Sequence, residues 1–206
     1  MFDESVLYRS IHRYMASLDG QQPPSNEVHQ SSMKQLSEWL KQRVKQKSDI
    51  IVICTGNSRR SILTSTLGNI LAAYRNWEGV RFFSAGTSPS AFNLRTIATL
   101  KQIGVEITAT GSQAKAGTMG EKNPHYKVQW GKGKDSFSLE YSKTLADVSL
   151  PARDFAALLV CSEADRECPV VEGASIRLGL PFADPKEHDG KPNEAACYAQ
   201  TRDLIA

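Results

Sequence analysis

Cys54 and Arg60 stand close together in a short polar loop that reads CTGNSRRS and ends at Ser61. A thiolate is a strong nucleophile, and a guanidinium can bind two oxygens of a tetrahedral anion side by side. The spacing therefore predicts a site at which Cys54 attacks an oxyanion bound by Arg60, while Ser61 donates its hydroxyl to the sulfur. A cysteine at a strand end is often an inert core residue, but the arginine and serine argue for chemistry here.

The elements on either side of this loop explain how it could hold an anion. The apolar run before Cys54 predicts a buried strand, and apolar residues at helical spacing from Ile62 to Tyr74 predict a helix after it. A helix N-terminus presents unpaired N–H groups and a positive dipole end, so a loop in front of it can cradle an oxyanion and stabilise a thiolate. Because Arg59 is adjacent to Arg60, its side chain is expected to point elsewhere. The expected anion-binding loop consists of Thr55, Gly56, Asn57, Ser58, Arg59 and Arg60.

Beyond residue 48 the pattern predicts strands and helices in alternation. Continuous apolar strands that alternate with helices are typical of a parallel sheet covered on both faces. The predicted fold is therefore α/β, with three layers and a four-stranded parallel sheet. Ligands bind outside the carboxyl ends of such strands, where Cys54 and Cys161 both fall. Strands are predicted at residues 50–54, 80–86, 154–161 and 175–180, and helices at 60–76 and 93–104.

Two segments lie outside this alternation. Residues 1–48 predict two amphipathic helices that pack on the domain formed by residues 49–206, with a dimer contact as the alternative. Residues 110–150 are rich in Gly and Lys and predict an inserted hairpin around Gly131 to Lys134, with the lysines on a solvated face. The apolar faces of the two N-terminal helices are expected to comprise Leu7, Ile11, Tyr14, Met15 and Leu18, and Val28, Met33, Leu36, Leu40 and Val44.

The loop also resembles a known motif. CTGNSRRS is similar to the phosphate-binding loop of the low-molecular-weight protein tyrosine phosphatases and of the arsenate reductases built on the same fold. The segment SAGTSPSAFNLRTIATLKQIGVEI resembles the stretch after the second strand in that superfamily. The resemblance runs from about Asp49 to the C-terminus, with residues 110–150 as an insertion. A late Asp-Pro pair in the superfamily lies over the site, which implies that Asp184 is the general acid and that Pro185 stiffens its loop.

Two further cysteines bear on the reaction, because phosphate and arsenate are nearly isosteric and the loop alone does not separate them. VCSEADRECPVV, which contains Cys161 and Cys168, resembles the redox segment of the thioredoxin-coupled arsenate reductases. The resemblance implies that Cys54 attacks arsenate and that Asp184 aids loss of water. Cys161 then attacks Cys54 and releases arsenite. Finally, Cys168 forms a disulfide with Cys161 that thioredoxin reduces.

A disulfide between Cys161 and Cys168 restricts the conformation of the segment between them. A helix over residues 162–168 would separate Cys161 from Cys168 by about 10 Å along its axis at 1.5 Å per residue. A disulfide tolerates a Cα separation of only about 4.4–6.8 Å. The sequence therefore predicts a marginal helix that is mobile in the reduced state and unwinds on oxidation. Cys197, in another helical stretch, is expected to have no catalytic role.

Two other functions stay open. One is a phosphatase that hydrolyses phosphotyrosine or small phosphoesters through a cysteinyl-phosphate, and the other is a non-enzymatic sensor of oxyanions or thiols. Lys186 disfavours phosphotyrosine, because the tyrosine phosphatases commonly carry Tyr there.

No cofactor and no metal are expected. Cys-x6-Cys is not a common zinc spacing, His125 and His188 form no ligand pair, and Ser65 replaces the glutamate that lies near potassium in the reductases.

The composition argues against nucleic acid and membranes as binding partners. A net charge of +3 is too small to argue for nucleic acid, and 40% hydrophobic with 23% charged residues is ordinary for a globular protein. No apolar run approaches the roughly 18 residues of a membrane helix. The N-terminal segment lacks the apolar core of a secretory signal, so a cytoplasmic location with reduced thiols is expected. The expected partners are an arsenate- or phosphate-type oxyanion and thioredoxin.

Overall fold

A four-stranded parallel sheet forms the centre of the protein. The computed structural model describes residues 6–21, 26–43, 46–167 and 170–206. The strands lie in the order β2-β1-β6-β7, and all their pairings are parallel. The α/β class and the four-stranded parallel sheet predicted from the sequence are therefore confirmed. The strand bounds are β1 Ser48–Cys54, β2 Val80–Gly86, β6 Phe155–Leu159 and β7 Ala174–Gly179.

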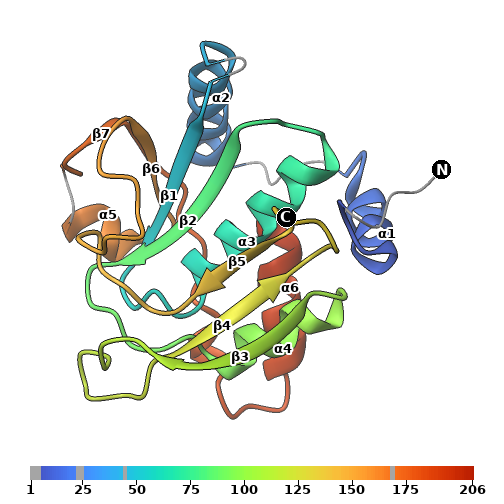
Figure 1. Ribbon diagram of the computed structural model, residues 1–206, viewed down its shortest axis with the longest axis vertical. Helices are drawn as coiled ribbons and strands as arrows, with labels where there is room; N and C mark the ends of the chain where they lie inside the picture. Colours follow the sequence, from blue (N-terminus) through green and yellow to red (C-terminus); the bar gives the residue numbers. More distant parts are fainter. Residues whose placement is uncertain (1–5, 22–25, 44–45, 168–169) are drawn as a thin grey trace.

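Helices flank this sheet (Figure 1). Helix α3 (Arg60–Tyr74) packs on β1 and β2, and α4 (Leu94–Gln102) and α6 (Glu194–Ile205) pack beside it. The short helix α5 (Ser162–Glu167) packs on β1 and β6. Every residue of β1 and β6 is buried, which is why both strands are almost continuously apolar. Cys54 ends β1 and Cys161 follows β6 by two residues, so both thiols lie at the carboxyl edge of the sheet.

The N-terminal helices pack on different parts of this assembly. Helix α1 (Arg9–Leu18) lies next to α3 and buries Ile11 and Met15, as its periodicity predicts. Helix α2 (Glu27–Lys41) packs on β7. Nothing within the described residues is a helix long and apolar enough to cross a membrane.

The buried face of α2 differs from the prediction. Met33 is 49% exposed and Val28 54% exposed, whereas Trp39, absent from the predicted face, is 7% exposed. Trp39 donates its indole N–H to Ser175 Oγ at 3.0 Å, and Ser32 donates to the carbonyl of Gly179 at 2.5 Å. Leu36 is buried as predicted and Leu40 packs against the same core, whereas Val44 lies outside the described residues. The contact face thus mixes polar and apolar residues, so apolar periodicity alone finds only part of it.

The segment after α4 forms a second, antiparallel sheet in the order β3-β4-β5. Its strands are β3 Glu106–Gln113, β4 Pro124–Gln129 and β5 Phe137–Glu140. The predicted hairpin is present as β4 and β5, but β3 begins before residue 110 and adds a third strand. The expectation of solvated lysines is wrong for Lys143, which is 6% exposed and lies with Nζ 3.8 Å from Glu140 Oε2. That buried pair anchors the end of the sheet to the parallel core.

Candidate functional site

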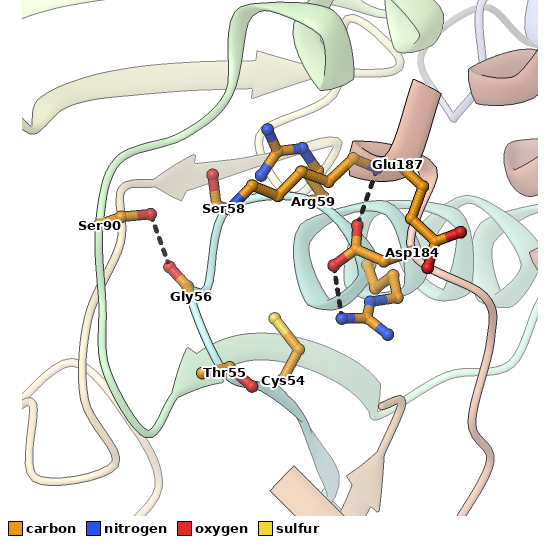
Figure 2. A pocket seen from close by; sticks show the side chains of 10 residues that line it. Cys54, Thr55, Gly56, Ser58, Arg59, Ser90, Asp184 and Glu187 are labelled. Carbon is orange, nitrogen blue, oxygen red and sulfur yellow. Dashed lines mark hydrogen bonds and ion pairs between the residues drawn. The ribbon is translucent and has the colours of Figure 1, made fainter. Parts of the chain in front are cut away.

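A pocket of about 580 Å³ opens at the carboxyl end of β1. Figure 2 shows the sulfur of Cys54 pointing into it, with Asp184 on a separate loop across the space. Asp184 begins a segment, residues 184–189, that we call the acid-bearing loop. Most of it forms η1 (Pro185–His188), a short 3-10 helix. The pocket is lined by Cys54, Thr55, Gly56, Ser58, Arg59, Arg60, Ser90, Asp184, Lys186 and Glu187.

The loop after β1 is held with its carbonyls turned into the protein. The segment that follows β2 supplies most of the donors: the amide of Thr87 bonds the carbonyl of Cys54, and the amide of Ser88 bonds that of Thr55. Ser90 donates its amide to Gly56 O at 3.0 Å, and Asn93 donates to Ser58 O at 3.2 Å. Ser142 Oγ donates to Asn57 O at 2.5 Å. Each carbonyl from Cys54 to Ser58 is therefore occupied.

The amides of the same loop are turned the other way. Within the part of the chain that the structure describes, none of the amides from Thr55 to Arg59 donates to a protein acceptor. The loop leads directly into the N-terminus of α3, whose dipole adds a positive potential. Asn57 permits this path with a φ of 41°, a left-handed conformation that asparagine tolerates better than most residues. The loop is a nest of donors suited to an anion.

Cys54 is buried and has a defined polar neighbour. Its Sγ lies 3.1 Å from Ser61 Oγ, and Asn57 Nδ2 donates to the same hydroxyl at 2.9 Å. Because Ser61 Oγ accepts the hydrogen bond from Asn57, its own hydroxyl proton is left to donate to the sulfur when Cys54 is a thiolate. Asn57 is fixed in turn, because its Oδ1 accepts the amide of Lys143 at 2.8 Å. The stretch just after β5, through the amide of Lys143, thereby helps to orient the Ser61 hydroxyl beside the sulfur.

Arg60 and Asp184 meet over the pocket. Arg60 donates to Asp184 Oδ2 at 2.6 Å and to the carbonyl of Phe182 at 3.0 Å. The Asp184 carboxylate also accepts the amide of Lys186 at 3.0 Å and so caps η1. Arg60 thus lines the same pocket as Cys54, but its guanidinium is engaged by the segment from Phe182 to Asp184. An anion on the loop amides would compete with Asp184 for Arg60.

Arg59 is bound by two residues outside the loop. Its guanidinium donates to Asp189 Oδ2 and to Tyr198 OH, each at 2.6 Å, while its side chain lines the pocket. Burial, and next the hydrogen bond to Asp189, raise the pKa of Tyr198 to about 12. Burial alone would raise the pKa of Asp189, but the Tyr198 hydrogen bond and the Arg59 charge outweigh it and lower that pKa. The group is thus an anion paired with a cation at neutral pH.

Cys161 lies beside the loop rather than in the pocket. Strands β1 and β6 are neighbours, with Ile53 paired to Leu159, so both strands deliver a cysteine to the same edge. Cys161 is fully buried, and its Sγ lies 3.6 Å from Thr55 Oγ1 and accepts the amide of Ala164 at 3.4 Å. The short helix α5 follows it. Cys168 lies outside the described residues.

Several pocket residues were not among the sequence predictions. Ser90 and Glu187 line the space beside Lys186, which the sequence had already singled out, and Asp189 and Tyr198 bind Arg59. Ser90 lies in the segment that resembles the superfamily, and this resemblance was the one sequence signal that could have placed Ser90 at the pocket. Tyr198 sits far along the chain on α6, and no local pattern marks it. Among the described residues, no cluster of three His, Cys, Asp or Glu side chains could hold a metal.

Comparisons with known proteins add little to this geometry. No family model matches the chain, and no curated protein sequence matches it. Among solved structures, it is similar to the YwlE arginine phosphatase from Geobacillus stearothermophilus. The identity is 17% over 77% of this chain and 88% of that chain, with a TM-score of 0.37. At this TM-score the two folds superpose only loosely, and the roles of the site residues rest on the geometry of this chain.

Proposed function

We propose that the protein is an arsenate reductase that works through Cys54, Cys161 and Cys168 and is regenerated by thioredoxin. The observation that carries this proposal is the contact between Cys161 Sγ and Thr55 Oγ1 at 3.6 Å. It puts a second thiol directly against the loop that carries the nucleophile. A simple hydrolase has no use for a buried thiol at this position, whereas a reductase needs one within reach of Cys54.

The first step uses the pocket alone. The loop amides and Arg60 bind arsenate, and the thiolate of Cys54 attacks arsenic to form a sulfur–arsenic bond. An arsenic–oxygen bond breaks, and the oxygen leaves as water with a proton from Asp184. Binding of the anion draws Arg60 from Asp184, and the released carboxylate takes up a proton from the incoming H₂AsO₄⁻, which it then passes to the leaving oxygen. The Ser61 hydroxyl stabilises the sulfur before the attack.

The second step changes the oxidation state. The thiolate of Cys161 attacks Cys54 Sγ, the sulfur–arsenic bond breaks, and its electron pair stays on arsenic. Arsenic(V) is thereby reduced to arsenite, and the two thiols are oxidised to a Cys54–Cys161 disulfide. Cys168 then attacks Cys161 and releases Cys54 as a thiolate. Thioredoxin supplies the two electrons that reduce the Cys161–Cys168 disulfide.

Phosphomonoester hydrolysis is the second candidate, and one observation favours it. The residues that line the pocket include Cys54, Arg60 and Asp184 but not Cys161. Nucleophile, anion clamp and acid suffice for transfer of a phosphoryl group to Cys54 and its hydrolysis by water. Lys186 at the rim of the pocket suits a small anionic substrate better than an aromatic phosphoester.

The two candidates differ in their need for the second thiol. The test is consumption of NADPH that depends on arsenate, with thioredoxin and its reductase present. Cys161→Ser should abolish this consumption, and the matched control Cys197→Ser should retain it. Persistence of turnover in Cys161→Ser refutes the reductase. Hydrolysis of a phosphoester by both variants, without arsenate turnover by the intact protein, would identify a phosphatase, and anion binding without any turnover would identify a sensor.

A further inference from the structure

Two consecutive arginines fasten the acid-bearing loop at its two ends. Arg60 binds Asp184, which precedes η1, and Arg59 binds Asp189, which follows it. Both N–O distances are 2.6 Å. The stretch between the two carboxylates is therefore tied at both ends to the loop that carries Cys54. Lys186 and Glu187, which line the pocket, lie within this tied stretch.

The second fastening joins three side chains rather than two. Asp189 accepts both from Arg59 and, at 2.7 Å, from the hydroxyl of Tyr198. Tyr198 is 1% exposed and accepts in turn from Arg59 Nε, so the three side chains close a ring. A planar guanidinium held by two partners loses little further entropy when it forms each hydrogen bond. We refer to Arg59, Asp189 and Tyr198 as the latch.

The latch is itself braced by α4 and α6. Arg95 Nε lies 3.5 Å from Asp189 Oδ1 and 2.7 Å from Glu194 Oε2. Glu194 also accepts the amide of Gly190 at 2.5 Å, immediately beyond Asp189. The hydrogen bond from Gly190, and next the contact with Arg95, lower the pKa of Glu194. The far end of the acid-bearing loop is thus fixed to the helical layer independently of Arg60.

The two fastenings differ in what happens when an anion arrives. Arg60 lines the pocket together with Cys54 and donates to Asp184, so an oxyanion bound there competes with Asp184 for its guanidinium. Arg59 points its donors at Asp189 and Tyr198, which lie outside the anion cradle. Binding therefore weakens the first fastening and leaves the second. We propose that the latch is a positioning device that holds Asp184 over the pocket once an oxyanion has drawn Arg60 away.

This inference deepens the proposed function, since it rests on an oxyanion bound to the loop and on Asp184 as the acid. It assigns different tasks to neighbouring residues of one motif. Arg60 engages the anion, and Arg59 keeps the proton donor in place. It also explains why a helix as distant in sequence as α6 contributes a buried tyrosine that binds Arg59 and Asp189.

Hydrogen exchange of the amides from Lys186 to Gly190 measures the latch directly. Exchange in Asp189→Asn should rise only a few fold without ligand, because Arg60 still holds Asp184. In saturating inorganic phosphate it should rise about tenfold or more, since coupled sites show nonadditive effects of this size. The wild-type loop should stay protected in both conditions. Equal exchange in Asp189→Asn with and without phosphate, once binding is established, overturns the proposal.

A second arm needs no ligand and no activity. Arg60→Met removes the first fastening, so the double variant Arg60→Met/Asp189→Asn should exchange much faster than the two single effects predict. An additive result overturns the latch. Asp154→Asn is the matched control, because it breaks an Arg43 pair of the same 2.6 Å distance away from the site and should leave the loop unchanged.

The two arms separate this inference from the proposed function. Failure of the wild-type protein to bind phosphate in calorimetry would count against the oxyanion site, while the double variant would still decide the latch. Loss of arsenate turnover in Cys161→Ser tests the reductase and does not bear on the loop. Tyr198→Phe should reproduce the effect of Asp189→Asn in part, because it removes the hydroxyl of the ring and keeps the buried aromatic group.

Discussion

Gly86 offers a sharp test of the loop geometry because it has no role in the chemistry. It is the last residue of β2, and it lies against the backbone of the anion loop. A Cβ built on it would stand 2.6 Å from the carbonyl oxygen of Thr55 and 2.8 Å from the amide nitrogen of Asn57. Both contacts are closer than van der Waals packing allows, and both partners are backbone atoms. Gly86→Ala must therefore displace the loop.

The magnitude follows from these contacts. Overpacking of a well-packed site costs about 1–3 kcal/mol of unfolding free energy. For a chain of this size each kcal/mol corresponds to about 2–4 °C in Tm. Displacement of reacting groups by about 1 Å can lower turnover about 100-fold. Gly86→Ala should therefore unfold a few degrees lower and bind phosphate at least tenfold more weakly, with a larger loss in arsenate turnover.

Calorimetric titration with phosphate and thermal unfolding are the assays. Gly179→Ala is the control, since it lies at the end of another strand of the same sheet and its Cβ would meet only the Asp165 carboxylate, at 3.3 Å. That variant should keep phosphate binding. A folded Gly86→Ala protein with wild-type phosphate affinity would refute the claim that the loop amides, held in this shape, form the anion site.

Three further variants probe individual groups. Asp184→Asn should lower turnover about 10²–10⁴-fold through loss of proton donation. Phosphate should bind this variant more tightly, because the carboxylate that competes for Arg60 is gone. Steady-state kinetics and titration measure the two effects, and an unchanged rate would remove Asp184 from the mechanism. Ser61→Ala should slow alkylation of Cys54 by iodoacetamide about 2- to 12-fold, because a hydrogen bond of about 0.5–1.5 kcal/mol to the sulfur is lost, and equal rates would contradict this role. Because the folded-state pKa of Asp189 is lowered, its contribution to stability is present above the unfolded value of about 3.8 and is lost as pH falls below it. In Asp189→Asn the unfolding free energy, measured by urea denaturation, should fall less steeply as the pH is lowered below about 4. An unchanged pH dependence would argue against the pairing of Asp189 with Arg59 and Tyr198.

The features that the sequence predicted well are local ones. Apolar runs predict the central strands β1 and β6, because strands buried on both faces need continuous apolar residues, and the edge strands β2 and β7 follow from their alternation with helices. Cys54, Arg60 and Ser61 stand in one short segment, so their proximity depends only on the turn between a strand and a helix. Asp184 was found through the resemblance, because an Asp before Pro is common in turns and carries little signal by itself.

The features that were missed depend on tertiary contacts. Trp39 and Ser32 face β7 through hydrogen bonds, so the apolar pattern of α2, which gave Leu36 correctly, missed part of its buried face. Lys143 is buried because its amide binds Asn57 and its ammonium group lies near Glu140. Tyr198 reaches Arg59 from a helix more than a hundred residues later. Such pairings arise from the packing of distant segments, and no spacing rule records them.

The cysteine cascade is the central claim, and trapping its first disulfide tests it most directly. Cys168→Ser should stop the reaction after a single turnover, because nothing then frees Cys54 from Cys161. After incubation with arsenate and blocking of free thiols, peptide mass spectrometry should find Cys54 joined to Cys161, with one arsenite released per chain. Arsenate-treated protein with both thiols free, or with either one joined to Cys197, would contradict the proposed mechanism.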